Sequence, residues 1–255
     1  MSKPLILISN DDGITAKGIR VLVEEISAFA DVFVVAPDSP QSGMGHAITM
    51  NNPLRVMESK IFGDIPAFEV SGTPVDCVKL ALDKFLPRRP DLMVSGINHG
   101  SNASINVIYS GTMSAAVEAA IDNIPAIGFS LCDYTYDANF DHTRKYVSEI
   151  AIQTLKNGLP SGVLLNVNFP HSSKEIKGIR ICRQANAHWD ESFLEREDPF
   201  KRKYYWMKGD FVNKDKGKDT DEYALSKGYV SVVPTQFDLT AHTAISLINQ
   251  WDFKL

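Results

Sequence analysis

The chain has 255 residues, which is enough for one sizeable hydrophobic core, with or without an appendage. Its composition, 44% hydrophobic and 22% charged, is that of a globular protein and excludes extended disorder. The formal net charge is −5 and the basic clusters are short, so we expect no nucleic-acid duplex as a partner.

The sequence predicts neither a secretory signal nor a membrane span. The apolar run after Lys3 ends at Ser9, which is too short for a secretory apolar region, and no stretch approaches the length of a transmembrane helix. The cysteines Cys77, Cys132 and Cys182 are odd in number and lack Cys-x-x-Cys spacing. This pattern indicates core thiols in a reducing cytoplasm, not a zinc site or a disulfide framework.

The first predicted strand, residues 5–8, ends at an unusual polar segment. Its apolar run has no polar alternation, which is typical of a strand buried on both faces in a parallel sheet. Open α/β sheets bind ligands at the carboxyl ends of their strands. The neighbouring carboxylates of Asp11 and Asp12 repel each other unless a cation or a proton separates them, so they predict a divalent-metal site. The alternative is a turn at Gly13 with an aspartate capping the next helix.

Strands and helices alternate along the following chain. A helix over 19–26 and a buried strand at 31–37 make a βαβ unit with a right-handed crossover. Two segments of alternating polarity, 54–58 and 67–70, are expected to pair antiparallel. Further helices are predicted over 74–85, 111–120 and 147–155, and further buried strands at 91–96, 125–130 and 162–169. The alternation predicts a doubly wound, mostly parallel α/β sheet of the Rossmann-like type over residues 1–175.

The composition changes in the C-terminal part, residues 176–255. The segment 183–221 is charged and aromatic, which favours a projecting hairpin or a subunit contact, and the alternative is a long surface loop. A late strand is predicted at 229–234 and a terminal helix over 243–251. We therefore expect an appendage that contributes to an oligomer and to the active site.

Four polar segments, 10–12, 39–43, 95–98 and 109–112, are expected to meet at one edge of this sheet. Hard divalent cations prefer oxygen ligands, which Asp11, Asp12, a serine of the second segment and Asn98 can supply. No cluster of His and Cys occurs, which disfavours zinc. Asn98 taken alone is more typical of a turn residue.

Residues 110–112, Ser-Gly-Thr, begin a predicted helix after a loop rich in glycine and asparagine. Free backbone N–H groups and two hydroxyls at a helix start can bind an anion, although Ser110 can equally serve as a simple helix cap. Neither a P-loop nor a dinucleotide-binding glycine pattern is present.

Asp238 and His242 are four residues apart after the late strand and share a face if the segment is helical. A carboxylate that hydrogen-bonds an imidazole favours its charged form, which suits a proton donor to a leaving oxygen. The alternative is that Asp238 or Thr240 caps the last helix and His242 lies on its surface.

These segments together resemble the survival protein E (SurE) family of metal-dependent 5′-nucleotidases. The resemblance spans nearly the whole chain, through segments 8–13, 35–43, 71–77, 90–102, 109–116 and 228–242. It implies one divalent metal ion, Mg²⁺ or Mn²⁺, held by Asp11, Asp12, Ser42 and Asn98. It places Asn10, Asn102, Ser110, Gly111 and Thr112 around the phosphate, with Asp238 and His242 as a catalytic pair. It also implies a homodimer or homotetramer with an exchanged C-terminal element.

Two departures from the family pattern occur. Residues 103–106, Ala-Ser-Ile-Asn, replace the more usual Gly-x-Asp, and segment 183–221 matches poorly, so no base or sugar preference follows from the resemblance.

We therefore predict a cytoplasmic phosphomonoesterase that hydrolyses nucleoside 5′-monophosphates, with 3′-monophosphates and short polyphosphate as further candidate substrates. Asp11 is either a metal ligand only or a direct nucleophile. The rival hypotheses are a haloacid-dehalogenase-type phosphatase, which uses Asp-x-Asp in place of adjacent aspartates, and a nucleotide-sensing binding protein without turnover.

Overall fold

One mixed sheet organises the chain. The structure, a computed structural model, describes residues 3–135 and 137–253, and within them nine strands form this sheet in the order β3-β4-β2-β1-β5-β6-β7-β11-β8. Neighbouring strands are parallel except for β3 with β4 and β7 with β11. The strands are β1 (Leu5–Ser9), β2 (Asp31–Pro37), β3 (Val56–Glu58), β4 (Ala67–Val70), β5 (Leu92–His99), β6 (Ala126–Leu131), β7 (Val163–Phe169), β8 (Ile179–Ile181) and β11 (Val230–Gln236).

The side chains of β1 are buried on both faces of the sheet. Ile6 and Ile8 belong to one hydrophobic cluster, whereas Leu5 and Leu7 belong to another. Successive side chains of a strand point to opposite faces, so an unbroken apolar run is what a strand between two helical layers requires. The predicted doubly wound, mostly parallel α/β fold is confirmed, as is the antiparallel pairing of the two amphipathic segments.

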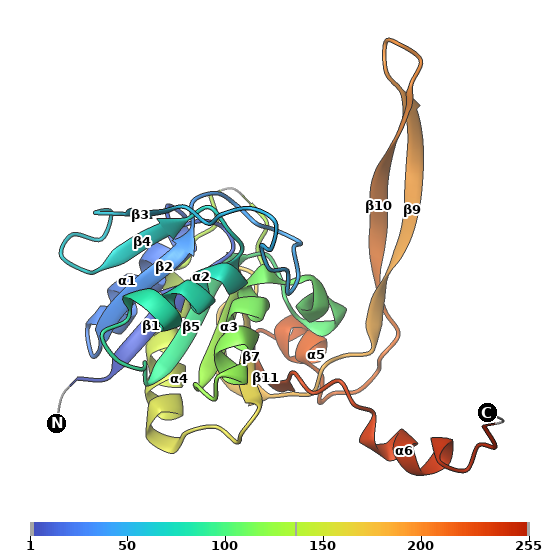
Figure 1. Ribbon diagram of the computed structural model, residues 1–255. Coiled ribbons are helices and arrows are strands. Elements are labelled where there is room, and N and C mark those ends of the chain that lie inside the picture. Colours follow the sequence, from blue (N-terminus) through green and yellow to red (C-terminus); the bar gives the residue numbers. More distant parts are fainter. Residues whose placement is uncertain (1–2, 136, 254–255) are drawn as a thin grey trace.

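Helices cover both faces of the sheet (Figure 1). α1 (Lys17–Ser27) and α4 (Arg144–Asn157) contribute to the first cluster, and α2 (Pro74–Leu80) and α3 (Gly111–Ile121) to the second. The remaining helices are η1 (Ala81–Phe85), η2 (Ser104–Tyr109), η3 (Asp141–Thr143), α5 (Asp221–Ser226) and α6 (His242–Ile248). None of the helices in the described part of the chain is long and apolar enough to cross a membrane.

The parallel register brings the ends of β1, β2 and β5 together. Ser9 pairs with Ser95, so the segment after β1 begins beside the last residues of β5. The Ile14 N–H donates to the carbonyl of Pro37 at 2.9 Å, and this bond joins the same segment to the end of β2. Polar residues that are far apart in sequence therefore meet at one edge of the sheet.

The C-terminal part contributes both to the sheet and to an appendage. β8 and β11 extend the sheet beyond β7, while β9 (Ala187–Glu197) and β10 (Lys203–Asn213) form a separate antiparallel hairpin. Figure 1 shows this hairpin projecting from the molecule, with α6 lying apart from the helical layers. The hairpin predicted for the aromatic segment is confirmed. α6 contains no buried residue, so little within the described chain supports it.

Candidate active site

A pocket of about 490 Å³ lies at the carboxyl edge of the sheet. This volume is within the range of small-molecule sites. Five of the predicted site residues line it: Asp11, Ser42, Asn98, Asn102 and Ser110. The rest of the lining consists of Gly43, His99, Ser101, Asn106, Tyr109, Tyr134, Trp189, Glu191, Met207, Lys208 and Gly209.

Asp11 is the most enclosed carboxylate of the pocket, with only 4% of its surface exposed. The Thr112 hydroxyl donates to its Oδ1 at 2.5 Å. A Cβ added at Gly111 would lie 2.7 Å from the Cβ of Asp11, so the start of α3 can approach this closely only with glycine there. Burial and the neighbouring charge of Asp12 raise the pKa of Asp11 to about 6, against the opposing hydrogen bonds from Thr112. A cation beside the two carboxylates would remove this penalty.

Asp12 and Asn10 flank Asp11 without lining the pocket. The Asp12 Oδ2 accepts the backbone N–H of His99 at 3.1 Å, and burial raises the pKa of the Asp12 carboxyl. The Asn10 amide donates to the carbonyl of Gly13 at 2.9 Å. Its buried Oδ1 has no hydrogen-bond partner within the described residues.

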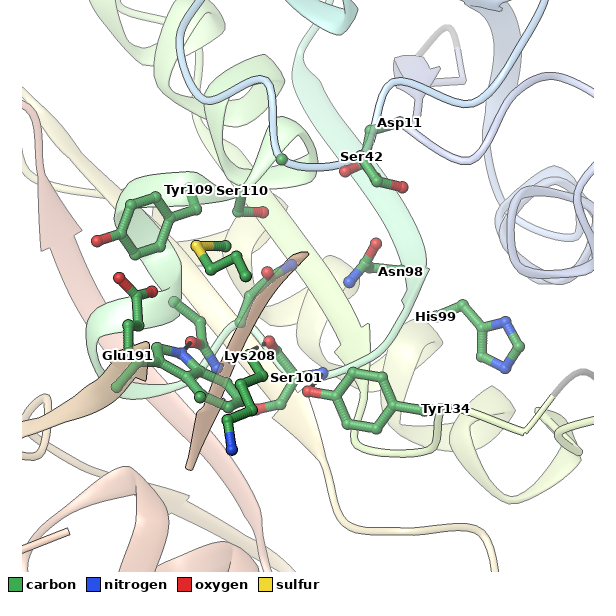
Figure 2. Close-up of a pocket in the computed structure, with 16 residues that line it drawn as sticks. Asp11, Ser42, Asn98, His99, Ser101, Tyr109, Ser110, Tyr134, Glu191 and Lys208 are labelled. Atoms are coloured by element: carbon green, nitrogen blue, oxygen red, sulfur yellow. Dashed lines mark hydrogen bonds between the residues drawn. The ribbon is translucent and has the colours of Figure 1, made fainter. Parts of the chain in front are cut away.

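Ser42 and Asn98 present two further oxygens. The loop that carries Ser42 is held by a bond of 2.7 Å from the Gln41 N–H to the carbonyl of Asp11. The Asn98 amide nitrogen donates to the carbonyl of Gly100 at 2.9 Å, which is the turn role considered for it. Figure 2 shows that its carboxamide oxygen faces Asp11 and Ser42. The turn bond thus orients Asn98 instead of excluding it from the pocket.

The donor set suits a hard divalent cation. Asp11, Asp12, Ser42 and Asn98 offer oxygen atoms only, which Mg²⁺ and Mn²⁺ prefer. Among the described residues no three or more His, Cys, Asp and Glu side chains are grouped as metal ligands, so the candidate oxygen donors include a hydroxyl and an amide beside the two carboxylates. The unpartnered Asn10 oxygen and the raised pKa of Asp11 indicate a place that is electrostatically incomplete without an added group.

Ser110 is the N-cap of α3, because its hydroxyl oxygen accepts the N–H of Met113 at 3.0 Å. The capping alternative is therefore confirmed. The same side chain lines the pocket, and its hydroxyl hydrogen remains free to donate. Thr112 is fully buried against Asp11, so it supports the carboxylate.

Asn102 is held by a network of buried polar side chains. Its amide donates to the Ser130 hydroxyl at 2.8 Å, and its backbone N–H donates to Asn168 Oδ1 at 2.8 Å. Its carbonyl accepts from Asn166 at 2.9 Å. These bonds join the loop after β5 to β6 and β7, so Asn102 has a defined position at the pocket.

The Asp238–His242 pair is formed but lies away from this pocket. The imidazole Nε2 is 2.9 Å from Asp238 Oδ2, with 65% of the His242 side chain and 49% of the Asp238 side chain exposed. α6 begins at His242, so Asp238 precedes the helix, where it accepts the N–H of Thr240 at 2.9 Å. Hydrogen bonds from Thr240 and His242 lower the pKa of Asp238 to about 2. Within one chain, Asp238 and His242 therefore contact each other but do not lie beside the residues that line the pocket.

Comparison with known proteins identifies the family. The family model described as "Survival protein SurE" matches residues 6–191. The chain belongs to the SurE family. A SurE protein of Christiangramia forsetii, named 5′-nucleotidase SurE, is 63% identical over 99% of this chain and 98% of its own. One of Cytophaga hutchinsonii with the same name is 60% identical over 99% of each chain. The crystal structure of the SurE protein from Aquifex aeolicus has a TM-score of 0.83 at 36% identity, covering 96% of this chain and 98% of that one.

One wall of the pocket in this SurE-family chain was not predicted from the sequence. Trp189, Glu191, Met207 and Lys208 come from the hairpin, and the last two lie beyond the residues that the family model matches. Their aromatic and charged character was visible in the sequence. Their position beside the pocket was not, because the sequence of an exposed hairpin does not indicate which part of the molecule the hairpin lies against.

Proposed function

We propose that this chain is a divalent-metal-dependent phosphomonoesterase that hydrolyses nucleoside 5′-monophosphates to nucleoside and inorganic phosphate. The observation that carries the proposal is the enclosed Asp11 carboxylate beside Asp12, at a pocket that Ser42 and Asn98 also line. The name 5′-nucleotidase SurE of the relatives supports the same activity. 3′-Monophosphates and short polyphosphate are further candidate substrates.

We propose Asp11, Asp12, Ser42 and Asn98 as the residues that hold one Mg²⁺ or Mn²⁺ ion. When bound, such an ion neutralises phosphate charge and lowers the pKa of a water molecule to near neutrality. The chain itself positions the ligands: Thr112 orients the Asp11 carboxylate, and the bond to Gly100 orients the Asn98 amide.

The phosphate is proposed to bind between the start of α3 and the loop after β5. The free hydroxyl hydrogen of Ser110 and the positive end of the α3 dipole favour an anion there, and Gly111 and Thr112 belong to the same first turn. Asn102 and Asn10 complete the proposed surroundings. Charge that develops on the phosphoryl oxygens is stabilised by such fixed donors.

The leaving ribose oxygen is proposed to take its proton from His242, oriented by Asp238. Because this pair lies outside the pocket of its own chain, we propose that His242 of the partner subunit serves each pocket in a homodimer or homotetramer. The exposed apolar side chains of the C-terminal element, among them Ile245, Leu247 and Trp251, support an exchanged contact. In this scheme residues 1–175 supply the metal and phosphate groups, and residues 176–255 supply the oligomer contacts and the proton donor. The three free cysteines support a reducing, cytoplasmic compartment.

The deciding experiment measures phosphate release from AMP and GMP with Mg²⁺ or Mn²⁺. We expect release that a chelator abolishes and that Asp11→Asn removes, whereas the exposed Asp64→Asn serves as a matched control and keeps it. A phosphoryl group trapped on the Asp11 carboxylate during turnover would favour the aspartyl-phosphate route over direct attack by water.

The rival hypothesis is a nucleotide-binding protein without turnover. The Asp238–His242 pair, which a sensor does not need, is formed in this chain and argues against that rival. Nucleotide binding without phosphate release under any divalent ion would establish that alternative.

A further inference from the structure

The hairpin presents one face to the pocket. Cross-strand partners of an antiparallel ribbon share a face, and β9 pairs Trp189 with Phe211 and Glu191 with Gly209. Trp189, Glu191 and Gly209 of this face line the pocket together with Met207. In Figure 2, Glu191 and Tyr109 lie on the side away from Asp11 and His99. The pocket therefore has one end at Asp11 and a distal end that is built largely by the hairpin.

Trp189 is held in place before any ligand arrives. Its indole N–H donates to Asn106 Oδ1 at 2.7 Å, and Asn106 in turn donates to the carbonyl of Ser101 at 3.3 Å. Phe211 packs edge-on against the indole, with ring centroids 5.4 Å apart. Trp189 as a whole residue nevertheless remains 38% exposed. A fixed, partly exposed aromatic surface is what a nucleobase stacks on.

Gly209 keeps this end of the pocket open. A Cβ at this position would lie 3.2 Å from the Glu191 Cγ and 3.5 Å from the Trp189 Cε3. The backbone of Gly209 is not in the left-handed region, so its conformation does not itself require glycine. The absent side chain leaves space beside both the indole and the carboxylate.

One charged group on this face has no partner. Glu191 lines the pocket, and its side chain forms no hydrogen bond or ion pair with another residue of the described chain. Lys208 alternates with Met207 and Gly209 along β10, so its side chain points to the opposite face of the hairpin. A carboxylate only accepts hydrogen bonds. Guanine offers an adjacent ring N–H and amino group as two donors, whereas the corresponding edge of adenine offers one, so Glu191 matches guanine better than adenine.

We propose that the hairpin recognises the base of the substrate and favours guanine. The base stacks on Trp189, and Glu191 accepts hydrogen bonds from its N1–H and amino group. The inference rests on the proposed function, because it concerns the far end of the same nucleotide. It assigns specificity to a segment that the family model covers only in part.

The first test compares kcat/KM for GMP and AMP in the full-length protein with divalent ion. We expect GMP to be preferred by about tenfold or more, the discrimination of a good bidentate pair. Glu191→Gln brings this ratio towards one. Glu197→Gln, which makes the same charge change on the same strand outside the pocket, leaves the ratio as it was. Glu191→Ala is a second variant and also lowers the ratio.

The second test needs no turnover. Guanosine and adenosine are titrated into the full-length protein, and quenching of tryptophan fluorescence reports binding. Guanosine should bind about tenfold more tightly than adenosine, and Trp189→Phe should remove most of the quenching.

The two proposals fail in different ways. Equal kcat/KM for AMP and GMP, or a preference for AMP, overturns the base inference and leaves the phosphatase intact. A guanine preference that Glu191→Gln and Glu191→Ala both leave unchanged also overturns it. No phosphate release from any nucleotide overturns the proposed function, and the nucleoside titration then decides the base inference alone.

Discussion

The carboxylate end of the pocket and its hairpin wall are built by different physical means. Asp11 is buried between β1 and the start of α3, with the Thr112 hydroxyl and a glycine fitted against it. The hairpin has its own backbone ladder, and most of its side chains are exposed. Substitutions around Asp11 are therefore expected to destabilise the fold, whereas substitutions on the exposed hairpin are expected to be tolerated. This difference suits a fixed catalytic site around Asp11 and a variable selectivity site on the hairpin.

The largest expected effect tests whether the buried sheet core contributes more to stability than the exposed hairpin. Phe129 is fully buried and stacks on Phe169, with ring centroids 6.0 Å apart. Phe129→Ala should lower the free energy of unfolding by about 3–5 kcal/mol in urea denaturation. Phe200→Ala at the hairpin tip, where the ring is 80% exposed, should change it by less than about 0.5 kcal/mol. Similar losses for the two variants would contradict the comparison.

The next effect concerns the fit of α3 against Asp11. An alanine at position 111 would place its Cβ 2.7 Å from the Asp11 Cβ, so Gly111→Ala displaces the carboxylate or the helix start. Because small displacements of reacting groups are costly, we expect kcat/KM to fall about 100-fold. Gly158→Ala strains a residue with φ of 68° in open space, so it should reduce stability without lowering kcat/KM. Unchanged activity in Gly111→Ala would show that Asp11 tolerates movement.

A smaller effect follows from Asp76, which ties the loop after β2 to α2. Burial alone would raise the pKa of Asp76, but hydrogen bonds from Thr49 and Thr73 outweigh it and lower the pKa. A depressed folded-state pKa means that the stabilisation is present above the unfolded pKa of about 3.9 and is lost as pH falls through the folded value. Asp76→Asn should therefore cost about 1–3 kcal/mol at pH 7.

The pH dependence of the Asp76→Asn effect tests whether the charge of the carboxylate is what stabilises the loop. In urea denaturation the difference between the parent chain and Asp76→Asn should shrink as the pH falls below about 4. The exposed Asp64→Asn should show no such pH-dependent difference. A gap that stays constant down to pH 2 would show that the carboxylate charge is not what stabilises the loop.

The smallest effect belongs to the hairpin. The Tyr205 hydroxyl donates to Glu195 Oε2 at 2.9 Å on the exposed surface of the hairpin. Tyr205→Phe should leave the urea midpoint unchanged, because water replaces an exposed hydrogen bond of this kind. A clear loss of stability would indicate that the hairpin is covered by another chain.

Sequence reasoning recovered the fold because burial on both faces leaves a direct pattern. The unbroken apolar run of β1 and the alternation of strands and helices sufficed to predict a doubly wound sheet, and its carboxyl edge then indicated where Asp11 and Asn98 would meet. Ser110 was harder, since a helix cap and an anion ligand use the same hydroxyl. In the structure, the Ser110 side chain both caps α3 and lines the pocket.

What the sequence determined by itself was local and periodic: the elements, the layers they form, and the acidic pair at the end of the first strand. Only the tertiary structure decided that the hairpin brings Trp189, Glu191 and Lys208 to the same pocket, and that Asp238 and His242 stay away from it within one chain. Hydrophobic periodicity reports which face of an element is buried. It contains no information on where the exposed hairpin or the terminal helix lies, because neither has a buried apolar face whose pattern would show what it packs against.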